Sequence, residues 1–154
     1  MSDQNFFTHL QGKQIYFIGI KGTGMTALAE IFVKKGALIS GSDTDEKFYT
    51  DKILDSLGIP YKEGFSVDNL PKDLDFIVHS AAYSSENNTE MAGALNLELP
   101  IFEYSEALGQ ISKPFFACGI SGVHGKTTTT SMSGTLLKYL NLPATILTGS
   151  GVNA

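Results

Sequence analysis

Short apolar runs alternate with stretches of helical periodicity along the first two thirds of the chain. The apolar runs predict buried strands, at residues 14–20, 37–40, 59–61, 75–80 and 100–102. Apolar positions spaced by three and four residues predict helices between them, at residues 25–35, 49–57, 89–97 and 104–111. Gly36 stands where a glycine commonly ends a helix. This alternation is typical of a parallel sheet with helices on its faces, so we predict an α/β domain over residues 1–112.

Lys113 and Pro114 interrupt this pattern. Beyond them, the sequence predicts a strand at residues 115–120, a loop rich in glycine and threonine, a helix at 126–140 and a strand at 144–148. Two strands and one helix cannot cover both faces of a parallel sheet. We therefore expect residues 113–154 to form the opening β–loop–α–β unit of a second α/β domain that is truncated in this chain.

Composition is that of a globular protein, with 154 residues, 42% of them hydrophobic and 18% charged. The longest apolar runs have four residues, whereas a membrane-spanning helix needs about 20. The first residues lack the basic and apolar regions of a secretory signal. The single cysteine, Cys118, permits no internal disulfide and suits a reducing compartment. These observations predict a cytoplasmic protein.

Charge is unevenly distributed along the chain. Residues 1–106 hold all 16 carboxylates and 8 of the 11 lysines, while residues 107–154 hold 3 lysines and no carboxylate. The overall charge of −5 argues against general nucleic-acid binding, which needs clustered cations. A segment without carboxylates favours phosphate binding, since nothing there repels the anion. The alternative is that carboxylates are absent from residues 107–154 by chance, because the segment is rich in serine, threonine and glycine.

Three glycines, Gly19, Gly22 and Gly24, lie between the first predicted strand and the first predicted helix. Glycines at such a junction let the backbone approach a pyrophosphate, whose charge then lies at the helix N-terminus. The spacing is GxxGxG rather than the GxGxxG of dinucleotide-binding folds. Asp43 follows Gly24 by 19 residues, where an acidic residue contacts a ribose hydroxyl in those folds. The pattern predicts a nucleotide-diphosphate site, and a tight turn packed against the sheet is the alternative.

A second glycine-rich loop, residues 122–125, precedes Lys126 and Thr127. Successive backbone amides in such a loop bind anions, and the dipole of the following helix adds to the attraction. Lys126 would reach the terminal phosphates of a nucleotide, and the Thr127 hydroxyl would bind Mg²⁺. The strict GxxxxGK[ST] motif is not met, because Ile120 stands in place of its first glycine. We predict an ATP-binding P-loop with Lys126 and Thr127 as catalytic residues, and a glycine- and threonine-rich helix cap is the alternative.

The remaining chemical groups carry weaker signals. His79, at the end of a predicted strand, fits a hydrogen-bonded core imidazole better than a ligand contact. Ser80 and Ala81 follow it, where ligands bind in open α/β sheets. The sequence shows no Ser/His/Asp arrangement and no zinc-ligand spacing.

Five short motifs, taken in order, resemble the Mur ligase family. They are GIKGTGM at 19–25, SGSD at 40–43, HSAA at 79–82, ENNTE at 86–90 and GVHGKTTTTSM at 122–132. The resemblance extends over residues 14–149 and implies a Rossmann-like domain that holds a UDP-sugar, followed by a central ATPase domain. In that family ATP phosphorylates a carboxylate of the nucleotide-sugar, and the amine of an amino acid attacks the acyl phosphate.

The resemblance also implies roles for individual residues. Those placed around the UDP diphosphate are Gly19, Lys21, Gly22, Thr23 and Gly24. Those placed at the uridine and the rest of the nucleotide-sugar are Ser42, Asp43, Ser80, Ala81, Ala82 and Asn88. The ATP loop comprises Gly122, Val123, His124, Gly125, Lys126, Thr127 and Thr128, with Thr127 on Mg²⁺. Departures from the family pattern are Thr89 for proline, Val123 for threonine and Tyr104-Ser105-Glu106 for Arg-Ala-Glu.

The implied substrates are UDP-N-acetylmuramate and L-alanine, with no nucleic-acid or membrane partner. The related ligase that joins a tripeptide to the same nucleotide-sugar is one alternative. A non-catalytic nucleotide-binding regulatory module is another, and half of an NAD(P)-dependent oxidoreductase is disfavoured by the glycine spacing. The family's magnesium-binding glutamate and histidine, its carbamylated lysine and its amino-acid-binding domain would lie beyond Ala154. We therefore expect the 154-residue chain alone to be inactive.

Overall fold

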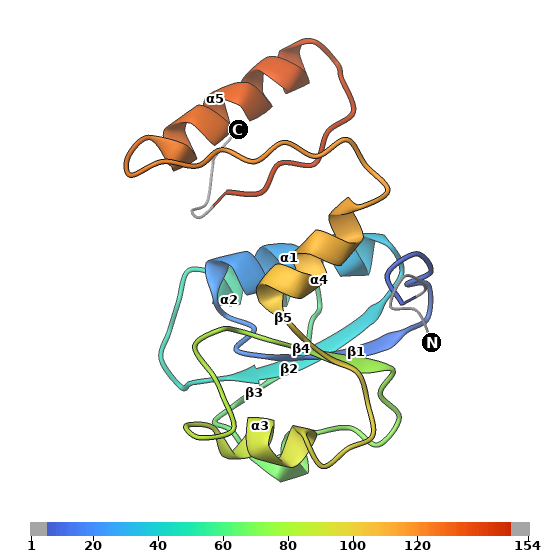
Figure 1. Cartoon of the computed structure of the whole chain (residues 1–154). Helices are drawn as coiled ribbons and strands as arrows, with labels where there is room; N and C mark the ends of the chain where they lie inside the picture. Colours follow the sequence, from blue (N-terminus) through green and yellow to red (C-terminus); the bar gives the residue numbers. More distant parts are fainter. Residues whose placement is uncertain (1–5, 149–154) are drawn as a thin grey trace. The chain divides into compact units, whose positions relative to one another are not determined.

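The computed structural model describes residues 6–148, which divide into two units at Pro114 and Phe115 (Figure 1). The first unit contains a five-stranded sheet of order β3-β2-β1-β4-β5, in which all pairs are parallel. Its strands are β1 (Gln14–Ile18), β2 (Leu38–Asp43), β3 (Tyr61–Glu63), β4 (Phe76–His79) and β5 (Ile101–Glu103). The order reverses between the neighbours β1 and β4, which makes the edge beside them a topological switch point.

Helices cover both faces of this sheet (Figure 1). The helical segments are α1 (Thr23–Lys34), α2 (Asp51–Ser56), the 3₁₀ turn η2 (Val67–Asn69), α3 (Thr89–Ala94) and α4 (Tyr104–Ser112). Residues of α1, α2 and α4 share one hydrophobic core, and residues of α3 belong to a second core. The predicted parallel α/β architecture is thereby confirmed for the first unit.

The central strand β1 shows why its sequence is continuously apolar. Ile15 and Phe17 belong to the core beneath α1, and Tyr16 and Ile18 belong to the core beneath α3. All four are at most 1% exposed. A strand that is covered on both faces has no solvent side on which polar residues would alternate.

Helix α1 ends as its sequence predicts. Gly36 has a φ of +84°, which glycine adopts without steric strain. Its amide donates to the Val33 carbonyl over 2.8 Å, and the Ala37 amide donates to the Phe32 carbonyl over 3.0 Å. This pair of hydrogen bonds is a Schellman motif, so the predicted C-terminal glycine of α1 is confirmed.

The third strand begins two residues later than predicted. The amides of Gly58 and Ile59 donate to the carbonyls of Asp55 and Leu54 and thereby close the end of α2. Ile59 is therefore used by the helix terminus, and pairing with β2 starts at Tyr61. Strand β2 also continues beyond the predicted residue 40, as far as Asp43.

The second unit contains one helix, α5 (Lys126–Tyr139), as predicted. The predicted strands at 115–120 and 144–148 are wrong, because no described residue of this unit belongs to a strand. A strand is stabilised by hydrogen bonds to a neighbouring strand and by burial of its side chains. Neither condition is met among the described residues: no strand lies beside these two segments, residues 115–120 and 144–146 are exposed, and residues 147–148 are only half-buried. Residues 149–154 of the predicted P-loop unit lie outside the described residues.

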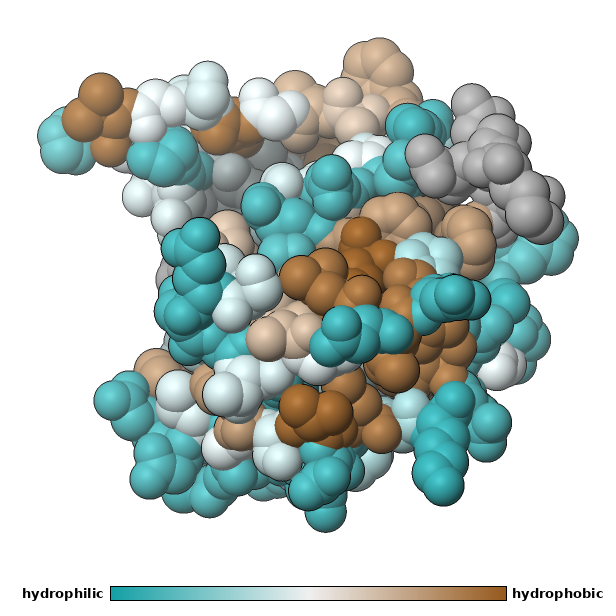
Figure 2. Space-filling view, turned by 60° about the horizontal axis from the view of Figure 1, so that its bottom comes forward, coloured by the Kyte–Doolittle hydropathy of each residue, from teal (hydrophilic) through white to brown (hydrophobic). Residues whose placement is uncertain are grey.

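Large apolar side chains reach the surface of both units. The surface view in Figure 2 shows hydrophobic groups set among hydrophilic ones. In the first unit they include Leu38, Val67 and Leu95, which are each more than half exposed. No helix within residues 6–148 is long and apolar enough to cross a membrane.

Candidate functional site

The predicted nucleotide residues gather where β1, β2 and β4 end. The glycine turn follows β1, Asp43 ends β2, and Ser80 follows β4. These strands are adjacent and parallel, so their carboxyl ends lie at one edge of the sheet. That edge includes the switch point, where ligands bind in open α/β sheets.

Residues at the end of β2 hold the glycine turn through its backbone. The amides of Gly19 and Ile20 donate to the Ser42 carbonyl over 2.8 and 3.1 Å. The Lys21 amide donates to Asp43 Oδ2 over 2.6 Å, and the Thr44 amide donates to Asp43 Oδ1 over 2.8 Å. Asp43 is 5% exposed, so its carboxylate fixes the turn in addition to any contact with a ligand.

The N-terminus of α1 leaves backbone donors open at this edge. No side chain caps the helix, and its first turn contains no acidic residue. The amides of Thr23, Gly24 and Met25 therefore have no partner within the helix. The first helical hydrogen bond runs from the Thr26 amide to the Gly22 carbonyl, over 2.8 Å. Free amides and the helix dipole together favour a phosphate at this position.

Two of the three glycines are also required by tyrosine side chains. A Cβ on Gly19 would lie 2.7 Å from the ring of Tyr83, and one on Gly24 would lie 2.8 Å from the ring of Tyr104. Gly22 is different, since a Cβ there would meet its nearest atom at 3.5 Å. The tight packing that we considered as the alternative therefore explains Gly19 and Gly24, while the free amides remain available to a phosphate.

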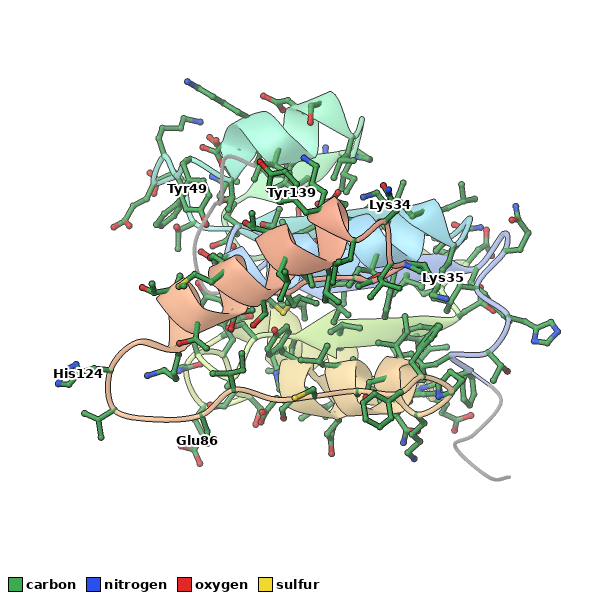
Figure 3. All side chains as sticks on the ribbon, turned by 90° about the horizontal axis from the view of Figure 1, so that it is seen from above. Lys34, Lys35, Tyr49, Glu86, His124 and Tyr139 are labelled. Atoms are coloured by element: carbon green, nitrogen blue, oxygen red, sulfur yellow. The ribbon has the colours of Figure 1, made fainter. Side chains whose placement is uncertain are left out.

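Tyr83 and Tyr49 border the site, and neither was among the predicted site residues. The Tyr83 hydroxyl lies 3.5 Å from Asp43 Oδ1, and its ring centroid lies 4.6 Å from that of Phe65. Burial and the nearby Asp43 carboxylate raise the pKa of Tyr83. Tyr49 is labelled in Figure 3, and its hydroxyl donates to Thr23 Oγ1, at the start of α1, over 2.9 Å. Tyr83 comes from a loop that no periodicity marks. Tyr49 stood at the start of the helix predicted at 49–57, but α2 (Asp51–Ser56) begins two residues later, so Tyr49 lies in the turn before it.

Ser42 directs its hydroxyl into a buried network rather than towards the edge. Its Oγ donates to Glu90 Oε2 over 2.6 Å, and the Tyr16 hydroxyl donates to Glu90 Oε1 over 2.7 Å. All three residues are at most 1% exposed. Burial raises the pKa of the Glu90 carboxyl, and the same burial, with Glu90 beside it, raises the pKa of Tyr16. Sequence reasoning missed Glu90, and the predicted uridine contact of the Ser42 side chain would require this network to open.

Asn88 combines a structural bond with an unused donor. Its Oδ1 accepts from the Met91 amide over 2.8 Å and thereby caps α3. Its Nδ2 is buried and has no hydrogen-bond partner among the described residues. A buried donor without an acceptor is unfavourable, and a ligand oxygen would satisfy it.

The segment after β4 is more exposed. Ser80 Oγ accepts from the Ala82 amide over 3.3 Å, and both Ala81 and Ala82 are exposed. His79 is partly buried, and its Nδ1 lies 3.1 Å from the Ser80 carbonyl. This contact agrees with a hydrogen-bonded imidazole rather than a free one.

The Lys21 ammonium is engaged inside the protein. It donates to the carbonyls of Thr44 and Glu46 over 2.8 and 3.0 Å, and the side chain is fully buried. The sequence-based hypothesis placed Lys21 at the diphosphate. Its backbone is part of the turn there, but its charge is held by the segment after β2.

In the second unit, carbonyl groups of the loop before α5 bind the Lys126 ammonium. Gly122 and Gly125 have φ values of +152° and +79°, which favour glycine. The Lys126 ammonium donates to the Gly122 carbonyl over 2.6 Å and to the Val123 carbonyl over 3.3 Å. Val123 is 86% exposed, and His124 points outwards from the loop in Figure 3.

The start of α5 suits an anion and supplies little for a metal. Its first turn, with Thr127 and Thr128, contains no acidic residue and no side-chain cap. Free amides beside Lys126 match the phosphates of a nucleotide. Residues 6–148 contain no cluster of three His, Cys, Asp or Glu side chains that could hold a metal ion.

Comparison with known families gives one clear match. The family model described as "Mur ligase family, catalytic domain" matches residues 14–116, which is about two thirds of the chain. The matched range covers the sheet of the first unit and the residues at its carboxyl edge.

Individual relatives agree with the family model. The chain is 51% identical to a UDP-N-acetylmuramate–L-alanine ligase of Treponema pallidum, over 94% of this chain and 30% of the relative. Among solved structures, a UDP-N-acetylmuramate:L-alanyl-γ-D-glutamyl-meso-diaminopimelate ligase of Neisseria meningitidis aligns with a TM-score of 0.75 and 33% identity. That alignment covers 84% of this chain and 40% of the other. The UDP-N-acetylmuramate–alanine ligase of Thermotoga maritima aligns with a TM-score of 0.69 and 29% identity, over 83% and 30%. The chain thus spans about 30% of the length of the curated relatives it matches.

Proposed function

The chain belongs to the Mur ligase family, and we propose that it is the nucleotide-sugar-binding part of a ligase that joins L-alanine to UDP-N-acetylmuramate. The observation that carries this proposal is the 51% identity to the Treponema pallidum enzyme along almost the whole chain. Because the chain spans about 30% of that enzyme, the activity, the substrates and a role in peptidoglycan synthesis are proposed for the whole protein. We place this reaction in the cytoplasm.

We assign the nucleotide-sugar to the edge of the sheet in residues 1–112. The UDP diphosphate lies on the free amides at the start of α1, beside Gly22 and Thr23, because these are donors without partners. Asp43 faces the uridine, and the remaining contacts come from Ser80, Ala81, Ala82 and the unpartnered amide of Asn88. Free amides, a carboxylate and a buried amide donor are the groups that a nucleotide-sugar requires.

We assign ATP to the segment from Gly122 to Thr128, within residues 113–154, which we interpret as the opening segment of an ATPase domain. When bound with Mg²⁺, ATP supplies the phosphoryl group that activates the muramyl carboxylate. Lys126 would then exchange the carbonyls of Gly122 and Val123 for phosphate oxygens. Thr127 would hold the metal through its hydroxyl.

The ligase that attaches a tripeptide is the second candidate. It is favoured by the Neisseria meningitidis structure, whose TM-score and identity are higher than those of the alanine ligase from Thermotoga maritima. Activity of the whole protein with each amine substrate separates the two candidates. We expect ADP release with L-alanine, and release only with L-alanyl-γ-D-glutamyl-meso-diaminopimelate would replace our assignment by the second.

Titration calorimetry of the 154-residue chain tests the nucleotide site itself. We expect UDP and UDP-N-acetylmuramate to bind, and NADH to bind more weakly than either. A preference for NADH would overturn the UDP-sugar assignment and return the oxidoreductase alternative. The variant Asp43→Asn is expected to weaken UDP binding, since it removes the charge that faces the nucleotide and holds the turn.

A further inference from the structure

Lys21 is tied to the segment after β2 through all of its polar groups. Its amide donates to Asp43 Oδ2 over 2.6 Å, and its carbonyl accepts from Thr50 Oγ1 over 2.6 Å. Both hydrogen bonds are buried. The backbone of the glycine turn and the segment 43–50 therefore form one hydrogen-bonded body at this point.

The Lys21 ammonium adds further contacts between the glycine turn and the segment after β2. Besides the carbonyls of Thr44 and Glu46, it lies 3.7 Å from Asp51 Oδ1 and 3.6 Å from Glu63 Oε1. It also lies 5.1 Å from the centre of the Tyr61 ring, which attracts a cation. A buried ammonium is stable only with such partners, and these come from three separate parts of the chain.

Removal of the ammonium would leave one buried acidic group without compensation, since Glu63 is also paired with Lys47 but Asp51 is not. Asp51 Oδ1 is buried and has no hydrogen bond among the described residues, so the Lys21 charge is what balances it. Contact with a diphosphate would require the ammonium to leave both carbonyls and both carboxylates. The free amides at the start of α1 provide the anion with donors that need no such rearrangement.

The segment that Lys21 holds carries two groups of the proposed site. Asp43 stands at its beginning, and Tyr49 near its end donates to Thr23 Oγ1 at the start of α1. Displacement of residues 44–50 would therefore move Tyr49 and would withdraw the Thr44 amide from the Asp43 carboxylate, so that both groups at the border of the nucleotide would be altered.

We propose that Lys21 is a positioning residue, which locks residues 44–50 against the glycine turn and does not bind the diphosphate. This inference rests on the proposed function, because it assigns the role of one residue within the nucleotide site. The two roles of a lysine differ in what they do to uridine. A ligand of the diphosphate affects UDP alone, whereas a positioning residue affects uridine and UDP alike.

Titration of the 154-residue chain with uridine and with UDP separates these roles. For Lys21→Met we expect both affinities to fall by about tenfold, because the Asp43 carboxylate, no longer held in place, would lose one charge-assisted hydrogen bond to the uridine. The ratio between the two affinities should stay unchanged. Loss of UDP affinity with intact uridine affinity would make Lys21 a diphosphate ligand. If Lys21→Met binds uridine and UDP as tightly as the wild type, Lys21 has no role in nucleotide binding. Either result overturns the inference and leaves the proposed function standing, whereas a wild-type chain that binds neither probe would contradict the proposed function.

Two further variants complete the experiment. Thr50→Val removes the hydroxyl that binds the Lys21 carbonyl without a change in charge, and we expect it to weaken uridine and UDP by the same factor. If Lys21→Met does not fold, Thr50→Val alone tests the proposal. Affinities of Thr50→Val for uridine and UDP equal to those of the wild type would then contradict the positioning role of Lys21. Lys34→Met is the matched control, since it removes an exposed lysine that pairs with Glu30 within α1, and both affinities should stay as in the wild type.

Discussion

At the scale of single residues, Glu90 is a carboxyl group buried without a cation. Its neighbours are the hydroxyls of Tyr16 and Ser42, and it takes part in no ion pair of the described residues. Burial raises the pKa of Glu90 above its ordinary value of 4.5. The folded state therefore keeps this proton at pH values where the unfolded state has lost it. Stability from this group is present below pH 4.5 and decreases as the pH rises through the raised pKa.

The variant Glu90→Gln tests this pH dependence. Glutamine keeps the size and the neutral charge of the protonated acid, so its contribution to stability does not change with pH. We expect the free energy of unfolding of the wild type, relative to the variant, to fall by about 1.4 kcal/mol per pH unit above pH 4.5 until the pKa of the folded state is passed. Urea denaturation between pH 4 and 8 measures it. Glu86→Gln at the surface is the control, and a wild-type curve parallel to that of Glu90→Gln would contradict the prediction.

Two helical glycines are expected to respond to alanine with opposite signs. In Gly24→Ala the new Cβ meets the Tyr104 ring at 2.8 Å, so we expect a destabilisation of about 1–3 kcal/mol from overpacking. In Gly109→Ala, within α4, the Cβ meets nothing within 4 Å, and the gain in helix propensity should stabilise by about 0.5–1 kcal/mol. Thermal unfolding of both variants measures the difference. Equal effects would show that Tyr104 moves aside freely.

At the scale of elements, Asn88 at the start of α3 has two roles: its Oδ1 caps the helix, and its Nδ2, unpartnered among the described residues, is available to a ligand. Asn88→Ala removes the cap of the helix and should lower stability by about 1 kcal/mol. Asn88→Ser keeps a capping oxygen and removes the unpartnered Nδ2 donor without adding a buried charge. We therefore expect Asn88→Ser to be more stable than Asn88→Ala and to bind UDP-N-acetylmuramate more weakly than the wild type. Thermal unfolding and calorimetry on the same samples check both halves, and full binding by Asn88→Ser would show that this donor does not reach the ligand.

Local patterns predicted the elements whose determinants are local. The apolar run of β1 was interpreted correctly, because a strand buried on both faces consists of consecutive apolar residues. The glycine after α1 was also interpreted correctly, because a left-handed residue at a helix end is commonly glycine. The strands predicted at 115–120 and 144–148 failed because a strand depends on neighbours that its own sequence does not contain.

The same distinction applies to the candidate site. The glycine turn and Asp43 were found through their spacing, and the structure brings them together at one edge. Tyr83 packs on Gly19, and Ser42 turns towards Glu90, through contacts between residues that are distant in sequence. Sequence periodicity does not report such contacts. The sequence therefore could not show that Gly19 leaves room for the Tyr83 ring, or that the Ser42 hydroxyl is hydrogen-bonded to Glu90.

At the scale of the whole molecule, the two proposed nucleotide sites lie in separate units of the chain. All 16 carboxylates precede residue 107, so the segment with Lys126 lacks the acidic partner that a P-loop needs for its metal. The described residues also contain no cluster suited to a metal. We therefore expect the 154-residue chain to release no ADP in the presence of L-alanine and UDP-N-acetylmuramate. Alanine-dependent release of ADP by this chain, measured in a coupled assay, would contradict the assignment of ATP chemistry to a longer protein.

In the whole protein, Lys126→Ala is expected to abolish ligation and to leave the nucleotide-sugar site intact. Lys126 lies in the loop before α5, where its ammonium can pass from the carbonyls of Gly122 and Val123 to phosphate oxygens. Its loss removes the charge that attracts the triphosphate, while the free amides of α1 are unaffected. Lys138→Ala, in the last turn of the same helix, is the matched control and should retain activity. ADP release and calorimetry with UDP-N-acetylmuramate measure the two functions. Full activity of Lys126→Ala would overturn the P-loop assignment, and a parallel loss of nucleotide-sugar binding would show that the two sites are not independent.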